Sequence, residues 1–133
     1  MGTVVVGYHG SKGSHAALDM AVELASRFGD QLVIVFGSGP PGGPGEEHRA
    51  HRHAIEERGE QVTGEAVERA RQGGVEVELV VSPERPAEAL HKLAAERGAR
   101  FIVVGSDADG APAGSVPHEL LQIAETPVVV VRA

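Results

Sequence analysis

Cysteine is absent from the 133-residue sequence, and this absence excludes several classes of site. Without a thiol the chain cannot form a disulfide framework, a thiolate metal site or a cysteine nucleophile. Long apolar runs are also absent: the longest, residues 32–36, is far short of the roughly 20 residues that span a bilayer. The first residues carry no basic segment before a long apolar stretch, so we expect no signal peptide. These absences favour a cytoplasmic protein with no membrane partner.

Aromatic residues and basic charge are scarce. Tryptophan is absent, aromatics make up 3% of the chain and 41% of residues are hydrophobic, so the core must be built from aliphatic side chains. Lysine and arginine total 12 against 19 aspartate and glutamate residues, a formal net charge of −7. An acidic surface repels nucleic-acid phosphates, so we expect no nucleic-acid partner. A chain of this length fits one domain, residues 1–133, that can bury its own core.

Short β-branched runs alternate with helical segments along the chain. Four of these runs lack polar alternation and are typical of buried strands, whereas another alternates at first, as an edge strand does. Apolar residues recur at helical spacing between them. The stretch over residues 37–45, rich in glycine and proline, is predicted to be a flexible connection. The expected strands are residues 3–6, 31–36, 75–81, 101–104 and 128–131, and the expected helices are residues 14–28, 46–72, 86–97 and 115–124.

Strands that alternate with helices imply a parallel sheet with right-handed crossovers and helices on both faces. Ligands bind such a sheet beyond the carboxyl ends of its strands, where the strand order reverses. Two turns at those ends, residues 7–13 and 105–114, contain glycine and lead into helices. Glycine lets the backbone approach a ligand, and the helix N-terminus behind it offers free N–H groups to an anion. Ser14 and Ser115 are expected to cap these two helices.

Three segments of the sequence carry a family resemblance. They are VVVGYHGSKGSHAAL near the start, SPERPAEALHKLAAERGARFIVVG in the second half, and FIVVGSDADGAPAGSVPHELLQIAETPVVVVR at the end. Together they resemble the universal stress proteins, over nearly the whole chain and most weakly in residues 37–72. With this resemblance we predict a Rossmann-like α/β fold: a five-stranded, parallel, doubly wound sheet of order 3-2-1-4-5, with about four helices, two on each face, in three layers.

The resemblance also implies a nucleotide site, which this sequence alters. Nucleotide-binding members of the family carry a G-x2-G-x9-G-S/T loop after the fourth strand. Gly105 matches its first glycine, and Gly114 and Ser115 match its end. Ala108 stands in place of the middle glycine, and five residues follow it where the family has nine. His9 replaces the acidic residue that ends the first strand in the family's nucleotide binders.

Two aspartates, Asp107 and Asp109, lie in this shortened loop, where phosphates would lie. Like charges about 4 Å apart repel by roughly 1 kcal/mol in water, and several times more near a protein surface. A Mg²⁺ ion that bridges carboxylates and phosphate would reverse the sign. We therefore expect a non-enzymatic stress-response domain with weak or absent ATP binding. The alternative is a sensor of an adenine nucleotide (ATP, AMP or cyclic AMP), and the candidate residues for a nucleotide or another anion are His9, Val35, Gly105, Ser106, Gly114 and Ser115.

The last strand predicts a partner. Residues 128–131 read VVVV and are apolar on both sides, and proteins normally cover such a sheet edge. The family resemblance implies a homodimer in which this strand pairs antiparallel with its counterpart in a second copy. The residues that would pair are Val128, Val129, Val130 and Val131.

The sequence contains residues suited to two other chemistries. A hydrolase triad could combine Ser106 or Ser115 with His9 and Asp107, but the chain lacks the G-x-S-x-G elbow, so we predict no catalytic residue. An H-x2-H-x-H pattern over residues 48–53 could hold Zn²⁺ or Ni²⁺. Its polar, arginine-containing surroundings favour a solvated helix face, so we predict no metal site.

Overall fold

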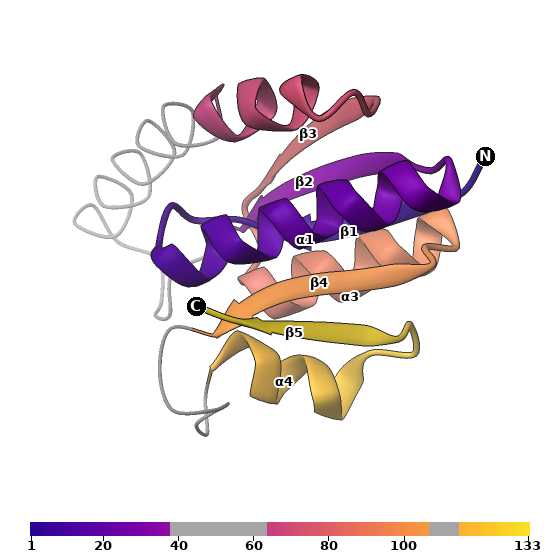
Figure 1. The fold of residues 1–133 in the computed structure, drawn as a ribbon. Helices are drawn as coiled ribbons and strands as arrows, with labels where there is room; N and C mark the ends of the chain where they lie inside the picture. Colours follow the sequence, from indigo (N-terminus) through magenta and orange to yellow (C-terminus); the bar gives the residue numbers. More distant parts are fainter. Residues whose placement is uncertain (38–63, 107–114) are drawn as a thin grey trace.

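The computed structural model of the chain describes residues 1–37, 64–106 and 115–133. Strands and helices alternate along them (Figure 1). Most of the predicted connection 37–45, and the predicted helix before residue 64, lie outside these residues. No helix in the described residues is long and apolar enough to cross a membrane. The strands are β1 (Thr3–Gly7), β2 (Gln31–Gly37), β3 (Val77–Ser82), β4 (Phe101–Ser106) and β5 (Val128–Arg132), and the helices are α1 (Lys12–Phe28), α3 (Pro86–Arg97), α4 (Val116–Ile123) and residues 64–72.

All five strands run parallel in one sheet of order β3-β2-β1-β4-β5, which confirms the predicted topology. The central strand is β1, where Val4 is in register with Leu32 of β2 and Phe101 of β4. The chain adds β2 and β3 on one side of β1 and then crosses to add β4 and β5 on the other side. The carboxyl ends of all strands meet at one edge, and a ligand crevice is expected there on either side of β1.

Helices cover both faces of the sheet and enclose two aliphatic cores. On one face lie α1 and the helical residues 64–72, and on the other lie α3 and α4 (Figure 1). Successive β1 side chains alternate between the two cores: Val4 and Val6 pack under α1, and Val5 packs under α3. This arrangement confirms the predicted three layers.

The first helix begins earlier than the sequence analysis predicts. Its N-cap is Ser11, whose Oγ accepts the N–H of Ser14 at 3.2 Å. The prediction that Ser14 caps this helix is therefore wrong. A cap accepts an N–H from the first turn, and Ser11 stands at the required distance before it. The other end agrees with the prediction, because Gly29 takes the left-handed conformation (φ 69°) that terminates α1.

An ion pair between a buried carboxylate and a partly exposed arginine stabilises the amino ends of the strands. Asp30 has a side chain that is 1% exposed, and its Oδ2 accepts Nε–H of Arg100 at 2.7 Å. The same carboxylate accepts the backbone N–H of Gly2 at 3.0 Å. The Arg100 hydrogen bond holds the pKa of the Asp30 carboxyl below its usual value. These contacts join the start of β1, the end of α1 and the start of β4, at the end of the sheet opposite the carboxyl ends of the strands.

Candidate functional site

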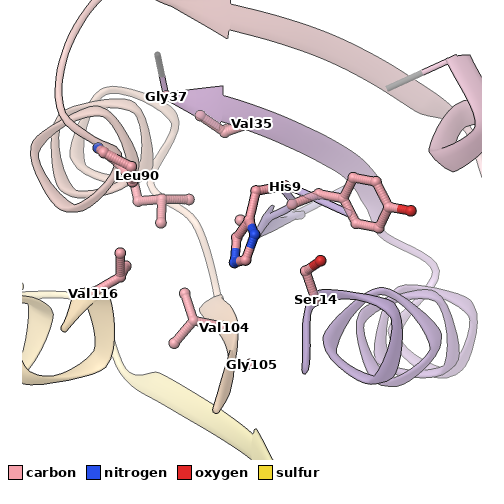
Figure 2. A pocket seen from close by; sticks show the side chains of 11 residues that line it. His9, Ser14, Val35, Gly37, Leu90, Val104, Gly105 and Val116 are labelled. Atoms are coloured by element: carbon pink, nitrogen blue, oxygen red, sulfur yellow. The ribbon is translucent and has the colours of Figure 1, made fainter. Parts of the chain in front are cut away.

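A crevice opens at the carboxyl edge of the sheet, between the ends of β1, β2 and β4 and the starts of α3 and α4 (Figure 2). Its volume is about 40 Å³, which is room for about three ordered waters. The wall is mostly aliphatic. Val35, Leu90, Val104 and Val116 supply this surface from four different elements. Segments distant in the sequence therefore meet around one cavity, as the predicted topology requires.

The turn after β1 divides its side chains between the crevice and the core under α1. The Tyr8 residue is 3% exposed and packs in that core, while its N–H donates to the Val35 carbonyl at 3.1 Å. Burial raises the pKa of the Tyr8 phenol, and the Glu65 carboxylate raises it further, so the hydroxyl is neutral at physiological pH. His9 points the other way, and its ring projects into the middle of the crevice (Figure 2). An incoming ligand would contact or displace this ring.

Serine hydroxyls fasten the same turn to the start of α1. Gly10 adopts φ 93°, and its N–H donates to Ser14 Oγ at 3.0 Å. The Ser14 hydroxyl donates to the Ser11 carbonyl, also at 3.0 Å, so Ser14 is held rigidly in the crevice wall. By contrast, His9 Nε2 lies 3.4 Å from Ser11 Oγ, at the long limit of a hydrogen bond. The backbone of the turn is fixed, and the His9 ring is only weakly restrained.

Gly105 lies where the end of β4 touches the first turn of α1. A Cβ atom on Gly105 would be 2.0 Å from the Gly13 carbonyl oxygen and 2.2 Å from its carbon. The two backbones are therefore in direct contact, which a side chain would prevent. Gly37 is related to α3 in the same way, since its Cβ would lie 2.6 Å from Pro86 Cα. At both positions glycine brings a helix start against a strand end and so sets the width of the crevice.

The start of α4 reaches the crevice through Val116. Ser115 caps this helix, as predicted: its Oγ accepts a backbone N–H of the first turn at 3.3 Å. Arg85, next to the start of α3, donates to Glu119 in the first turn of α4 at 2.5 Å. This ion pair links the two helices that close the crevice on the face opposite α1.

Of the predicted site residues, the structure brings His9, Val35 and Gly105 together in one crevice. Ser106 and Ser115 do not line it: Ser106 is buried at the end of β4, and Ser115 serves as the helix cap. The predicted Gly114 lies outside the described residues. So do the loop residues on which the phosphate argument depends, namely Asp107, Ala108, Asp109 and Gly110.

Most of the crevice wall comes from residues that were not predicted from the sequence. Helices that cover a parallel sheet begin at its carboxyl edge, so residues in their first two turns can reach the ligand region. That signal would have selected Ser14 of α1, Pro86 and Leu90 of α3, and Val116 of α4. The other lining residues outside the candidate list are Gly7 and Tyr8, which lie at the predicted turn 7–13, and Gly37 and Val104 at strand ends.

The other chemistries weighed from the sequence gain no support in this region. Within the described residues, no group of three or more histidine, aspartate or glutamate side chains could hold a metal ion. The histidine pattern formed by His48, His51 and His53 lies outside them. The hydroxyl beside His9 belongs to Ser11, not to the serines of the triad that was considered.

Comparison with known proteins identifies the family. A family model described as "Universal stress protein family" matches residues 1–132. "Universal stress protein YxiE" of Bacillus subtilis (strain 168) is 30% identical over 144 residues, with 97% of each chain covered. A solved structure from the same family in Burkholderia pseudomallei is 32% identical, with a TM-score of 0.81 and coverage of 98% of this chain and 96% of that chain. A solved universal stress protein in complex with cAMP is 31% identical, with a TM-score of 0.75 and the same coverage. The chain therefore belongs to the universal stress protein family.

Proposed function

We propose that this chain is a non-enzymatic, homodimeric stress-response domain that binds an adenine nucleotide in the crevice, and binds a monophosphate more tightly than ATP. The observation that carries the proposal is the shared cavity: His9, Val35 and Gly105 line one crevice where the strand order reverses. The relative solved in complex with cAMP, at 31% identity over nearly the whole chain, supports an adenine nucleotide as the class of ligand.

The crevice wall suits a purine base. Its surface is largely aliphatic, and no lysine or arginine is among its described lining residues. Ligand sites commonly combine such a wall with a few polar groups that fix orientation. The Val35 carbonyl accepts the Tyr8 N–H, and a carbonyl oxygen has a second lone pair that can accept an exocyclic amine. The base would therefore lie against Val35, with its sugar and phosphate toward the start of α4.

The negative charge in the sequence between β4 and α4 favours a nucleotide with one phosphate over ATP, which has three. Asp107 and Asp109 lie in that short stretch of the sequence. Each added phosphate brings more negative charge toward these carboxylates, at roughly 1 kcal/mol or more per close pair of unit charges. Mg²⁺ would offset this repulsion by binding carboxylate and phosphate oxygens together. ATP binding is therefore expected to be weak in chelator and to gain more from Mg²⁺ than cAMP binding does.

The size of the crevice favours a second candidate function, a ligand-independent interaction domain. At about 40 Å³ the crevice is far smaller than the roughly 300–1,000 Å³ of most ligand sites. A nucleotide can enter only if the His9 ring leaves the middle of the crevice (Figure 2). The weak 3.4 Å contact with Ser11 allows that movement. If the ring stays, the chain acts through its surfaces alone.

The homodimer is supported by the open edge of β5. Within the part of the chain that the structure describes, β5 pairs with β4 alone, and Val130 is 37% exposed. An apolar edge strand is a ready template for another strand, and a second copy would pair with it across a two-fold axis.

The absence of enzymatic activity is supported by the surroundings of His9. Ser11 Oγ is used as a helix cap, and among the described residues no carboxylate contacts the His9 ring.

Calorimetric titration with cAMP, AMP and ATP, in EDTA and in Mg²⁺, tests this proposal. We expect cAMP or AMP to bind at least about tenfold more tightly than ATP in EDTA, a difference of about 1.4 kcal/mol. Equal or tighter ATP binding in EDTA would contradict the monophosphate preference. No binding of any nucleotide at millimolar concentration would favour the ligand-independent domain. Phosphate release from ATP at a steady turnover would refute the non-enzymatic assignment.

A variant at His9 makes the same experiment specific to the crevice. His9→Asp introduces an acidic residue like the one that ends the first strand in the family's nucleotide binders. It also removes the imidazole ring from the crevice. We expect this variant to bind cAMP more tightly than the unmodified chain. His91→Asp, on α3 and outside the crevice lining, is the matched control and should leave cAMP affinity unchanged.

A further inference from the structure

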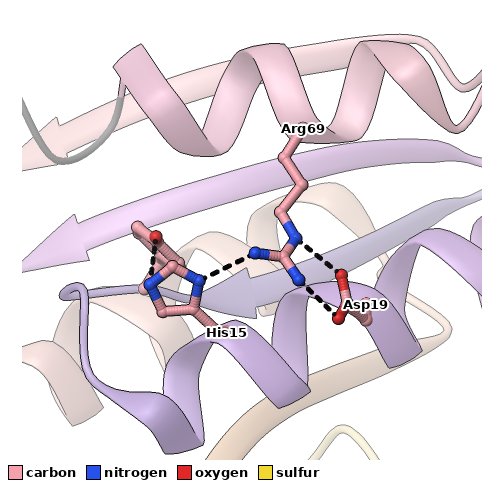
Figure 3. A network of polar contacts seen from close by, with 4 residues as sticks. His15, Asp19 and Arg69 are labelled. Atoms are coloured by element: carbon pink, nitrogen blue, oxygen red, sulfur yellow. Dashed lines mark hydrogen bonds and ion pairs between the residues drawn. The ribbon is translucent and has the colours of Figure 1, made fainter.

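A chain of polar contacts joins α1 to the helical residues 64–72 on the α1 face of the sheet (Figure 3). His15 stands at its centre: Nε2 lies 3.1 Å from the Tyr8 hydroxyl, and Nδ1 lies 2.9 Å from Nη1 of Arg69. The Arg69 guanidinium also donates to both carboxylate oxygens of Asp19, each at 2.8 Å. Arg69 is thus held to α1 by one histidine and one aspartate.

The protonation state of His15 follows from the chemistry of its partners. A guanidinium only donates hydrogen bonds, so the Nδ1 atom that receives Arg69 must carry a lone pair. In the neutral ring the hydrogen is then on Nε2, which donates to the Tyr8 oxygen. A protonated imidazolium has a hydrogen on both nitrogens, and its Nδ1–H would point directly at an Arg69 N–H. The observed contact is therefore compatible only with neutral His15.

Apart from this contact, the described residues 64–72 pack against the core beneath α1 through few and small side chains. The buried ones are Ala66 and Ala70, which are 1% and 0% exposed, and Val67 packs partly buried against the same core. At the end of the segment, Gly73 approaches α1 so closely that a Cβ would lie 2.4 Å from Val22 Cγ1. Small residues bury little apolar area, so polar contacts make up a larger share of the attachment.

The charged groups around His15 limit how the Arg69 side chain can move if His15 becomes protonated. The groove beside the ring is lined by Tyr8, Glu65, Glu68 and Arg69 among its ionisable residues, and Asp19 lies one turn along α1. The two Asp19 bonds fix the Arg69 guanidinium, so Nη1 cannot turn away from His15 without breaking that pair. A second positive charge on His15 would therefore strain the contact between the helices.

We propose that His15 is a pH-sensitive tie between α1 and the helical residues 64–72. The tie exists while the imidazole is neutral, and protonation of His15 breaks it and loosens the segment from α1. This inference goes beyond the proposed nucleotide binding and does not require a ligand. Imidazole is the side-chain group that ordinarily changes charge between pH 5 and 8, so the test compares pH values across that range.

Amide hydrogen exchange of the full chain at pH 7.5 and 5.5 tests the proposal, with rates corrected for intrinsic chemistry. We expect protection of the amides of residues 66–72 to fall about fivefold on acidification, the effect of losing one net hydrogen bond. His15→Gln should abolish the change, because its amide accepts from Arg69, donates to Tyr8 and does not titrate. His118→Gln, on α4, is the matched control and should behave like the unmodified chain.

Two results would overturn the proposal. One is unchanged protection of residues 66–72 in the unmodified chain between the two pH values. The other is an equal loss of protection in His15→Gln, which would assign the effect to other groups. If His15→Gln does not fold, Arg69→Gln replaces it, because an amide can donate to neutral His15 and accept from the protonated ring. Tyr8 is the single tyrosine of a chain without tryptophan, so its fluorescence reports the same transition independently.

Discussion

At the scale of single residues, the glycines at the strand ends set the distance between helices and sheet. Gly105 faces the Gly13 backbone at a separation that leaves no room for a methyl group. The sequence predicts a glycine turn at this point, but it does not reveal which neighbour requires the glycine. Only the packing of α1 against β4, two elements distant in the sequence, distinguishes close approach to a ligand from close approach to a helix.

Replacing Gly105 with alanine tests this role. The new methyl group would meet fixed backbone atoms, so α1 must move, and we expect Gly105→Ala to lower the free energy of unfolding by about 3 kcal/mol or more. Urea denaturation measures the change. Gly64→Ala is the control: its Cβ would meet nothing within 4 Å in a helical position, so this variant should be neutral or slightly more stable. Similar stabilities of the two variants would contradict the proposed packing role.

The Asp30 carboxylate gives stability a predictable dependence on pH. Its folded-state pKa is lowered by the Arg100 hydrogen bond, so the contribution is present above the unfolded-state pKa of about 3.9 and is lost as the pH falls through the lower folded value. We expect Asp30→Asn to lower the free energy of unfolding at pH 7 by about 1–3 kcal/mol. The difference from the unmodified chain should shrink below pH 4.

Urea denaturation at pH 7 and pH 3 measures this difference directly. Glu125→Gln, at an exposed position after α4, serves as the control and should change stability by less than about 0.5 kcal/mol at either pH. A loss in Asp30→Asn that is equally large at both pH values would show that packing, not the charge on the carboxylate, is responsible.

At the scale of secondary-structure elements, local signals predict most of the boundaries. The bounds of α3 agree with the prediction because Pro86 begins it and Gly98 ends it with φ 58°, and both signals act locally. Strands β1, β2 and β4 extend past their predicted ends into glycine or serine, since backbone pairing continues where the β-branched run has stopped. The predicted start of α1 is wrong because Ser11 and Ser14 are both suitable N-caps, and residue type alone does not choose between them.

The open edge of β5 carries the prediction of a homodimer. A lysine at Val130 would place a charge on the exposed apolar edge, which opposes pairing with a second copy. We expect the unmodified chain to sediment as a dimer at micromolar concentration and Val130→Lys to sediment as a monomer of about 13.8 kDa. Val81→Lys, on the similarly exposed opposite edge strand β3, is the control and should remain dimeric. A monomeric unmodified chain would refute the dimer.

At the scale of the whole molecule, the crevice exists because the strand order reverses beside β1. The alternation of strands and helices, together with the family resemblance, predicts that edge and places His9, Val35 and Gly105 on it. The opposite wall could not be predicted as readily. Leu90 and Val116 have the pattern of ordinary core residues in their helices, and only the tertiary arrangement places them at the open end of the core.

The proposed adenine-nucleotide site lies beyond β1 and β4, in this crevice. Titration of the ¹⁵N-labelled chain with cAMP, followed by amide chemical shifts, tests whether the nucleotide binds there. We predict saturable shifts concentrated at His9, Ser14, Val35, Gly105 and Val116, with amides at the opposite edge near Asp30 unaffected. Shifts centred elsewhere, or no shifts at millimolar cAMP, would contradict the claim.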